Sequence, residues 1–125
     1  MADVKFVSST SILRSLDEAK AREFYVDFLE FEIEFEHRFE PGLPLYLGLK
    51  FGACRLHITE HHGDAVPGGR VRIEVQGLVE YAKKLDAKNY KYARPGMPIR
   101  APWGELDLTV TDPFGNNINF YERSA

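Results

Sequence analysis

PWGELDLTVTDPFGNNINFYER, residues 102–123, consists of two alternating segments on either side of a tight turn. The turn is Asp-Pro-Phe-Gly at 112–115, and these residue types favour a type I turn at its first, second and fourth positions. Apolar and polar residues alternate on both sides of it with the period of two of a half-buried β-strand. The stretch therefore predicts a hairpin with one face on the core. Three surroundings are open for its polar face: bulk water, a metal ion or a captured small molecule.

The rest of the chain repeats one order of elements twice. The first half reads as strand, helix and three strands, with the strands at 5–13, 33–39, 45–51 and 54–59. The second half repeats this order, with strands at 70–75, 90–95, 105–111 and 117–122. Each helix carries an apolar stripe at three- and four-residue steps, and Ser15 with Glu18 is a capping box that begins the first helix. The recurrence predicts two βαβββ modules.

These modules define the predicted architecture. Residues 1–60 form the first module and residues 70–125 the second, while HHGDAVPGG at 61–69 is a Gly- and Pro-rich linker. Each module alone is too small to be stable, so both should share one core in a single domain over residues 1–125. The sequence thus predicts an α+β fold, in which a curved mixed sheet carries its helices on the convex face and encloses a concavity. The polar face of the hairpin can then point into a cleft.

Composition and charge exclude several classes of protein. The net charge of −3 argues against a nucleic-acid partner, because such proteins present a basic face to phosphates. The lone Cys54 excludes an internal disulfide and a cysteine zinc cluster. The chain has no signal-peptide pattern and no apolar stretch long enough to span a bilayer, so we expect a cytoplasmic protein without a membrane partner.

Three stretches carry a resemblance to a known superfamily. They are ILRSLDEAKAREFYVDFLEFE at 12–32, RVRIEVQGLVEYAKKL at 70–85 and PWGELDLTVTDPFGNNINF at 102–120. Together they resemble the vicinal oxygen chelate superfamily, which contains glyoxalase I and extradiol dioxygenases, and within it the bleomycin resistance proteins. The enzymes of that superfamily hold a divalent metal with His and Glu side chains. The resistance proteins lack this metal and bind the drug stoichiometrically in clefts between the two subunits of a homodimer.

The resemblance also locates the metal-ligand positions of the superfamily. In this chain they are occupied by Thr10, Arg55, Arg70 and Asn119. A catalytic divalent ion needs imidazoles or carboxylates, and the two guanidinium groups would repel it. We therefore expect no metal and no cofactor, and the resemblance favours a binding protein over an enzyme. A metal-dependent enzyme of the glyoxalase or dioxygenase kind is the alternative.

Two further interpretations stay open. His57, Glu60, His61 and His62 fall within six residues and offer ligands for a different metal site, although adjacent loop histidines are ordinarily solvated. Alternatively, the acids and bases of the predicted cleft pair with one another, as Arg70 and Arg72 could with Glu105 and Asp107, because desolvated charges without partners are costly. A cleft filled in this way would belong to a plain interaction module.

The resemblance and the residue chemistry together point to a ligand site. Trp103, the only Trp, lies between Pro102 and Gly104 outside a strand, where a core residue is not expected. Its ring offers a flat stacking surface, and the matching Trp of the bleomycin resistance proteins lies in their drug cleft. The predicted ligand-binding residues are Phe39, Tyr46, His57, Arg72, Trp103, Asp107 and Asn119. The sequence thus predicts a metal-free, homodimeric protein of antibiotic resistance that sequesters bleomycin or another flat heteroaromatic compound.

Overall fold

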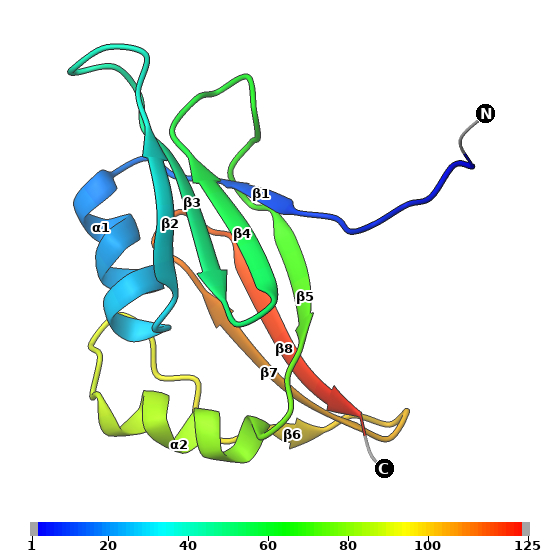
Figure 1. Ribbon diagram of the computed structural model, residues 1–125. Coiled ribbons are helices and arrows are strands. Elements are labelled where there is room, and N and C mark those ends of the chain that lie inside the picture. Colours follow the sequence, from blue (N-terminus) through cyan, green and yellow to red (C-terminus); the bar gives the residue numbers. More distant parts are fainter. Residues whose placement is uncertain (1–2, 124–125) are drawn as a thin grey trace.

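The computed structural model describes residues 3–123, so the outermost residues of both predicted modules, 1–2 and 124–125, lie outside it. Its strands form two four-stranded sheets (Figure 1). The first sheet contains β1 (Ser11–Arg14), β2 (Glu32–His37), β3 (Tyr46–Phe51) and β4 (Cys54–Thr59). The second contains β5 (Arg70–Glu74), β6 (Ile99–Arg100), β7 (Glu105–Thr111) and β8 (Asn117–Arg123). The helices are α1 (Glu18–Arg22), the π-helix η1 (Glu23–Phe28) that continues it, and α2 (Leu78–Ala87).

Both sheets have the same topology. The strand order is β1-β4-β3-β2 in the first sheet and β5-β8-β7-β6 in the second. In each, the strand that opens the module lies parallel to the strand that closes it, and the other pairs are antiparallel. The predicted α+β class with two βαβββ modules is therefore confirmed, with the strands divided between two mixed sheets.

The apolar stripes of both helices are buried as predicted. Phe24, Tyr25 and Phe28 of η1 are at most 2% exposed, and Leu78 and Leu85 of α2 at most 1%. They form one core with the apolar faces of the two sheets, whose main contributors are Leu47, Leu49, Leu56, Ile58, Ile118 and Phe120. Burying one large apolar side chain stabilises a fold by about 1.5–3 kcal/mol, so this shared core holds the two modules together. None of the helices within residues 3–123 is long and apolar enough to cross a membrane.

The start of the first helix differs from the prediction. Asp17, not Ser15, is the N-cap, and its carboxylate accepts a hydrogen bond of 2.9 Å from the backbone N–H of Lys20. Ser15 is buried, and its backbone N–H donates to the carbonyl of Thr59, which extends the pairing of β1 with β4. The predicted capping box of Ser15 and Glu18 is wrong because Ser15 still belongs to the edge of the sheet.

Strand β2 contains an irregularity that the sequence pattern did not indicate. Ile33 pairs with Leu49, but the next paired residue, Phe35, lies opposite Gly48. This bulge shifts Phe35 to the face of the sheet that Tyr46 occupies, against the simple alternation predicted for 33–39. The ring of Phe35 lies directly over Gly48, where an added Cβ would come within 2.1 Å of its Cε1 atom. Only a glycine at position 48 leaves room for that ring.

Two predicted strands are shorter or lie elsewhere. The strand expected at 5–13 is confined to β1, and residues 3–10 extend away from the body of the molecule (Figure 1). The segment 90–95 forms no strand, and the edge strand of the second sheet is β6 instead. The reason is that Tyr90 packs on Phe28 of η1, with ring centroids 4.7 Å apart, which holds this segment against the helix.

Candidate functional site

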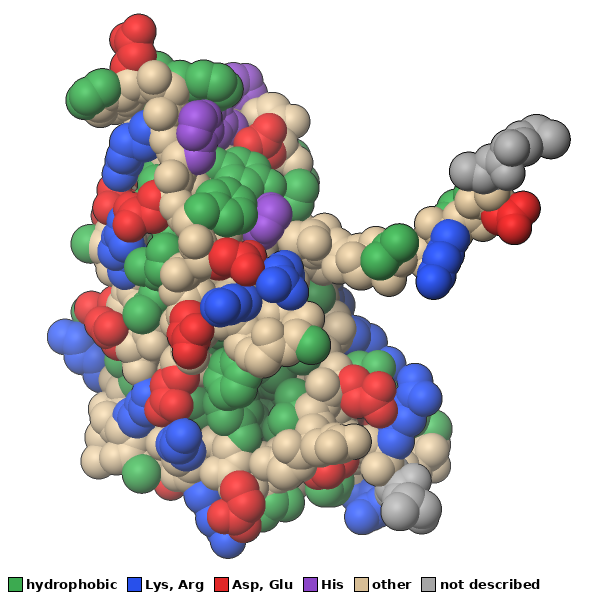
Figure 2. Space-filling model, viewed as in Figure 1, with side chains coloured by type: hydrophobic (Ala, Val, Ile, Leu, Met, Phe, Trp, Pro, Cys, Tyr) green, Lys and Arg blue, Asp and Glu red, His purple; other side chains and the backbone are tan. Residues whose placement is uncertain are grey.

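The first sheet bears a group of rings on the face opposite the helices. We call it the aromatic cluster, and it consists of Phe35, His37, Phe39, Tyr46, His57 and His61. The rings of Phe35 and Tyr46 are stacked within 8° of parallel at 6.1 Å, and His57 meets each of them edge-on at 5.2 Å. Figure 2 shows histidine and hydrophobic side chains gathered on this part of the surface. Phe35 is 39% and Phe39 74% exposed, so the cluster presents ring surface to whatever lies against the sheet.

A hydrogen bond fixes the centre of this cluster. The hydroxyl of Tyr46 lies 2.7 Å from Nδ1 of His57. Burial lowers the pKa of His57, and the carboxylate of Glu34 only partly opposes this. The neutral imidazole is thereby favoured, with Nδ1 accepting from the Tyr46 hydroxyl and Nε2 carrying the hydrogen. Burial likewise raises the pKa of Tyr46, so the phenol stays protonated. The pair can offer a ligand one donor beside two aromatic faces.

The second sheet carries a different group, which we call the charged cluster. Its members are Arg72, Trp103, Glu105, Asp107 and Asn119. The guanidinium of Arg72 donates from Nε to the Asn119 amide oxygen at 2.8 Å and from Nη2 to the carboxylate of Glu105. The same guanidinium lies over the ring of Tyr121, with Cζ 3.9 Å from the centroid. These three contacts fix the position and the plane of the Arg72 guanidinium at the centre of the charged cluster.

Asp107 leaves part of this cluster unsatisfied. Its Oδ1 is 3.7 Å from Nη2 of Arg72, which is an ion pair but too long for a hydrogen bond. Oδ1 is buried, and no donor among residues 3–123 makes a hydrogen bond to it. A buried acceptor without a donor costs about 1–3 kcal/mol. This unsatisfied oxygen lies beneath the surface of the charged cluster, so it is a cost to the fold and not a contact point for another molecule.

Trp103 stands at the edge of the charged cluster. Its side chain is 69% exposed, and its indole N–H donates to the carboxylate of Glu105. This bond, followed by the charge of Arg72, lowers the pKa of Glu105, so the carboxylate is ionised at neutral pH. The indole is therefore oriented from one edge while its faces stay open. Trp103 is not a core residue, which agrees with the expectation from its Pro and Gly neighbours.

The predicted ligand-binding residues fall into two groups. Phe39, Tyr46 and His57 lie in the first module, whereas Arg72, Trp103, Asp107 and Asn119 lie in the second. Within residues 3–123 no hydrogen bond, ion pair or ring contact joins the two clusters. Because side chains alternate along a strand and Phe120 faces the helix side, Asn119 points to the opposite side of its sheet. The predicted ligand-binding residues thus form two separate groups in one chain.

Of the four predicted metal positions, Arg55 and Asn119 are engaged with protein groups, Thr10 lies outside the sheets, and Arg70 is exposed in β5. Arg55 makes a two-pronged contact with the carboxylate of Glu34 at 3.0–3.3 Å. Asn119 is held by Arg72 and donates to the hydroxyl of Thr109 at 2.9 Å, while Thr10 is exposed before β1. In the described chain, no three side chains of His, Cys, Asp or Glu are grouped so that they could hold a metal ion.

Four members of the clusters were absent from the predicted ligand-binding residues: Phe35, His37, His61 and Glu105. The position of Phe35, within the strand predicted at 33–39, follows from the bulge opposite Gly48. A glycine inside a strand often marks a bulge or a close approach, so Gly48 was the signal available in the sequence. Glu105 was expected only as a charge partner of an arginine, and this pairing with Arg72 is confirmed.

Known structures of similar proteins share this fold. A bleomycin-binding protein from Streptomyces verticillus, crystallised with copper(II)-bleomycin, is 26% identical, with a TM-score of 0.72 over 98% of this chain and 100% of that one. A member of the glyoxalase/bleomycin resistance protein/dioxygenase superfamily from Sphaerobacter thermophilus is 21% identical, with a TM-score of 0.71 over 96% and 98% of the two chains. A bleomycin resistance determinant encoded on the transposon Tn5 is 19% identical, with a TM-score of 0.69 over 96% and 100%.

The second and third of these similarities show only a shared fold, because the sequence identities are 21% and 19%. No protein of curated function matches the chain. The sequence model of the glyoxalase superfamily matches residues 1–125, which is the whole chain. The protein therefore belongs to the glyoxalase superfamily.

Proposed function

We propose that this protein binds and sequesters a flat heteroaromatic small molecule, with bleomycin as the first candidate, in sites that two copies of the chain build together. The observation that supports the proposal is that the predicted ligand-binding residues fall into two groups in different modules, which we call half-sites. The aromatic cluster offers stacking surface and one donor, and the charged cluster offers an open indole and the half-exposed guanidinium of Arg72. A ligand held between the two would be stacked on both sides.

The likeness to the Streptomyces verticillus protein supports this choice of ligand. That protein was crystallised with copper(II)-bleomycin, and its fold extends over nearly the whole of both chains. Flat conjugated rings stack on exposed aromatic faces with about 1–3 kcal/mol per ring, as nucleobases do. Trp103 on one half-site and the Phe35–Tyr46 pair on the other would supply two such faces to one ligand.

Exposed apolar surface supports the participation of a second copy. Val4, Phe6 and Val7 on the extended arm are between 84% and 95% exposed. Three large apolar side chains on one short segment have no cover within the chain, and a partner subunit would bury them. We expect a homodimer whose interface exceeds about 2,000 Å², as in obligate dimers.

The residues at the superfamily's metal positions support binding without a metal. A divalent ion at these positions would have to displace the Glu34 carboxylate from Arg55 and the Arg72 guanidinium from Asn119, and would then lie beside two uncompensated cations. We expect that added Zn, Ni, Mn or Fe yields neither a stoichiometric complex nor glyoxalase or dioxygenase turnover. One tightly bound ion per chain that is lost on His57→Ala would favour the enzymatic alternative.

Titration of the single Trp tests the proposal directly. Because Trp103 is the only indole in the chain, its fluorescence reports on the charged cluster without interference. Bleomycin should quench it with saturation at one drug per site. An unchanged spectrum at millimolar bleomycin, together with no heat in calorimetry, would exclude this ligand.

Mixing two inactive variants tests the two-copy site. Trp103→Ala and His57→Ala each damage a different half-site, so each homodimer binds weakly. If a site combines the halves of two chains, mixed and reassociated subunits regain about a quarter of the intact sites, the value for random pairing in a symmetric dimer. Wild-type protein treated in the same way is the control. No recovery in dimers shown to have exchanged subunits would place both halves within one chain.

A further inference from the structure

One carboxylate oxygen joins the two flat groups of the charged cluster. Oε1 of Glu105 accepts a hydrogen bond from the indole N–H of Trp103 and another from Nη2 of Arg72. Trp103 lies in the turn before β7 and Arg72 in β5, so the two groups reach Glu105 from different parts of the second module. Because both donors meet at one atom, the indole nitrogen and the edge of the guanidinium are neighbours. We call Trp103 and Arg72 the stacking pair.

Glu105 is less accessible than the groups that it joins. Its side chain is 11% exposed, whereas that of Arg72 is 49% exposed and Trp103 is largely exposed. Glu105 is the first residue of β7, so its position is fixed by the sheet. A molecule that approaches the charged cluster from solvent therefore meets the indole and the guanidinium before it meets the carboxylate.

Both members of the stacking pair keep an open face. The guanidinium of Arg72 lies on the ring of Tyr121 with one face and is bonded along its edge to Asn119 and Glu105. Since about half of the side chain is still exposed, its other face is open. The indole of Trp103 is bonded at its N–H edge, and its faces are exposed. Guanidinium and indole groups both stack on flat conjugated rings, so one ligand can contact the two together.

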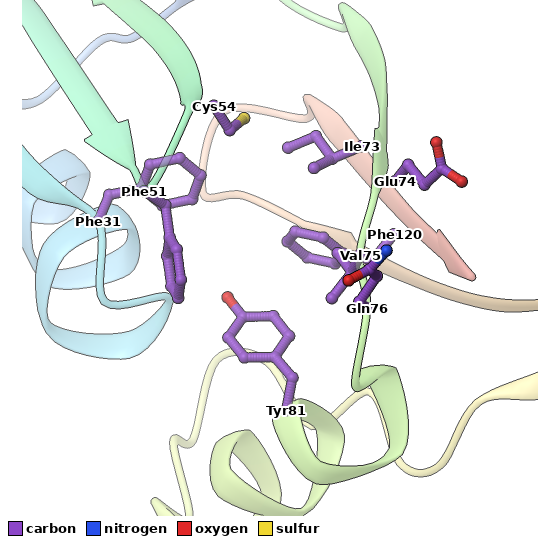
Figure 3. A pocket seen from close by; sticks show the side chains of 9 residues that line it. All are labelled: Phe31, Phe51, Cys54, Ile73, Glu74, Val75, Gln76, Tyr81 and Phe120. Carbon is purple, nitrogen blue, oxygen red and sulfur yellow. The ribbon is translucent and has the colours of Figure 1, made fainter. Parts of the chain in front are cut away.

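The stacking pair lies outside the pocket between the two modules. That pocket has a volume of about 270 Å³ and is lined mainly by apolar side chains, among them Ile73 and Phe120. Figure 3 shows Ile73 pointing into the pocket and Glu74 pointing away from it. Arg72 is two residues before Glu74 in β5, so both lie on the face of the strand that is turned away from the pocket. A ligand on the stacking pair therefore does not enter this pocket.

The two members of the pair depend on Glu105 to different degrees. Arg72 is also held by Asn119 and Tyr121, whereas Trp103 is too exposed for packing to fix its ring. The bond to Glu105 is thus the main restraint on the indole. A side chain that becomes ordered only when a ligand binds lowers the affinity by about 2- to 12-fold. An indole that is already oriented avoids this loss.

We propose that Glu105 is a positioning residue of the ligand site, which holds the Trp103 indole beside the Arg72 guanidinium so that one flat ligand contacts both. Glu105 acts through these two groups and does not touch the ligand. The inference rests on the proposed function for its ligand, but the orientation of the indole is a property of the free protein. The two can therefore be tested separately.

Fluorescence anisotropy of the single Trp tests the orientation without any ligand. Glu105→Met keeps the length of the side chain but removes the acceptor, and Glu105→Gln keeps an acceptor oxygen. The anisotropy, corrected for the excited-state lifetime, should fall in Glu105→Met and stay close to the wild-type value in Glu105→Gln. Glu18→Met is the matched control, because Glu18 also joins two groups, Arg22 and Arg38, but lies in the first module. It should leave the anisotropy unchanged.

Calorimetry with bleomycin tests the effect on binding. Glu105→Met should weaken the affinity by about 2- to 12-fold, and Glu105→Gln by less than about 2-fold. In a Trp103→Ala background, Glu105→Met should have a much smaller effect, because the group that depends most on Glu105 is already absent. Circular dichroism checks that each variant is folded, and Glu105→Ala takes the place of Glu105→Met if the latter does not fold.

Two results would overturn the proposal. One is an unchanged anisotropy in a folded variant without the acceptor, which would show that other groups hold the indole. The other is an equal loss of affinity in the wild-type and Trp103→Ala backgrounds, which would show that Glu105 does not act through Trp103. A wild-type protein that binds no bleomycin would remove the proposed ligand instead, and the anisotropy would still decide whether Glu105 orients the indole.

Discussion

The two ends of the β7–β8 hairpin have similar polar residues but opposite environments. At the turn, Asp112 and Asn116 are 4% and 0% exposed, and all of their side-chain polar atoms are bonded. Asp112 accepts from the backbone N–H groups of Phe114 and Asn116, from the Tyr25 hydroxyl and from the Asn116 amide, at 2.6–2.9 Å. At the open end, Trp103 is largely exposed, and an oxygen of Asp107 has no donor.

This difference separates the polar groups that build the fold from those that can recognise a ligand. Asn116 also donates to the carbonyl of Arg14 and accepts from the N–H of Gly69, so the turn joins the end of β1 to the end of the linker. A network satisfied in this way has no capacity left for another molecule. At the open end, the indole of Trp103 is still exposed. We therefore expect the turn to serve stability and the indole to contact the proposed ligand.

The largest expected effect is the loss of stability in Asp112→Ala. Four donors lose a charged acceptor in a buried site, so we expect the free energy of unfolding to fall by about 3–4 kcal/mol. Asp107→Ala on the same hairpin is the matched control: it removes a buried oxygen that has no donor, so the free energy of unfolding should not fall. Urea unfolding followed by circular dichroism measures both. Equal losses would mean that the two ends do not differ in role.

The next effect concerns Trp103→Ala. It should weaken ligand binding by about 5- to 150-fold, which corresponds to roughly 1–3 kcal/mol for one stacked ring. Because the side chain is largely exposed, the free energy of unfolding should stay within about 0.5 kcal/mol of the wild type. Calorimetry with bleomycin and urea unfolding give the two numbers. An unstable variant with unchanged affinity would assign Trp103 to the structural end of the hairpin.

A smaller effect is expected when a single hydroxyl is removed. Tyr25→Phe deletes a buried bond to the Asp112 carboxylate and should cost about 1.5–3 kcal/mol at most, since the Asn116 amide still satisfies the same oxygen. Tyr46→Phe, which removes the hydroxyl facing His57 in the partly exposed aromatic cluster, should cost no more than about 1 kcal/mol. Urea unfolding measures both losses. A larger loss of stability in Tyr46→Phe than in Tyr25→Phe would contradict the distinction between the buried network of the turn and the partly exposed cluster.

The smallest effect is a change in fluorescence with pH. The pKa of Glu105 is lower in the folded protein than the 4.5 of an unfolded chain, so the unfolded chain takes up the proton first as the pH falls. The ionised carboxylate therefore contributes its full stabilisation above pH 4.5, and this contribution is lost as the pH falls through the lowered pKa. Because the indole N–H donates to this carboxylate, Trp103 emission should change with a midpoint below 4.5. Removal of the guanidinium in Arg72→Ala should raise that midpoint. A wild-type midpoint at or above 4.5 would show that the indole does not hold the carboxylate.

Much of the fold was accessible from the sequence because it depends on local periodicity. The two helix stripes, the strands at 45–51, 54–59 and 105–111 and the turn at 112–115 follow from patterns within one segment. The bulge in β2 does not, because the position of Phe35 depends on Gly48 in the neighbouring strand. The true N-cap at Asp17 depends in the same way on the pairing of Ser15 with Thr59. Distant backbone contacts override the local signal in both places.

The candidate site was only partly accessible for a related reason. The residue types of the charged cluster and its Arg72–Glu105 pairing could be inferred from strand alternation and charge. Alternation tells which side chains of one strand lie on the same face. It does not tell which strands are in the same sheet, and so not which side chains of different strands are neighbours. The sequence therefore treated Tyr46 and Trp103 as the lining of one cleft, whereas the structure places them in separate modules.

The parallel closure of both modules has a consequence for how the chain folds. Ser11 pairs with Leu56 and Arg70 with Asn117. The first strand of each module therefore cannot pair until the last strand of that module is in place. Pairings between distant segments form late, since the entropy of closing the intervening loop is lost before they contribute. On the ribosome, β1 and the arm before it must stay unpaired until β4 has emerged. We expect slow refolding. Nascent chains on the same mRNA would be close together while β1 of each is still unpaired, so β1 could pair with β4 of a neighbouring chain.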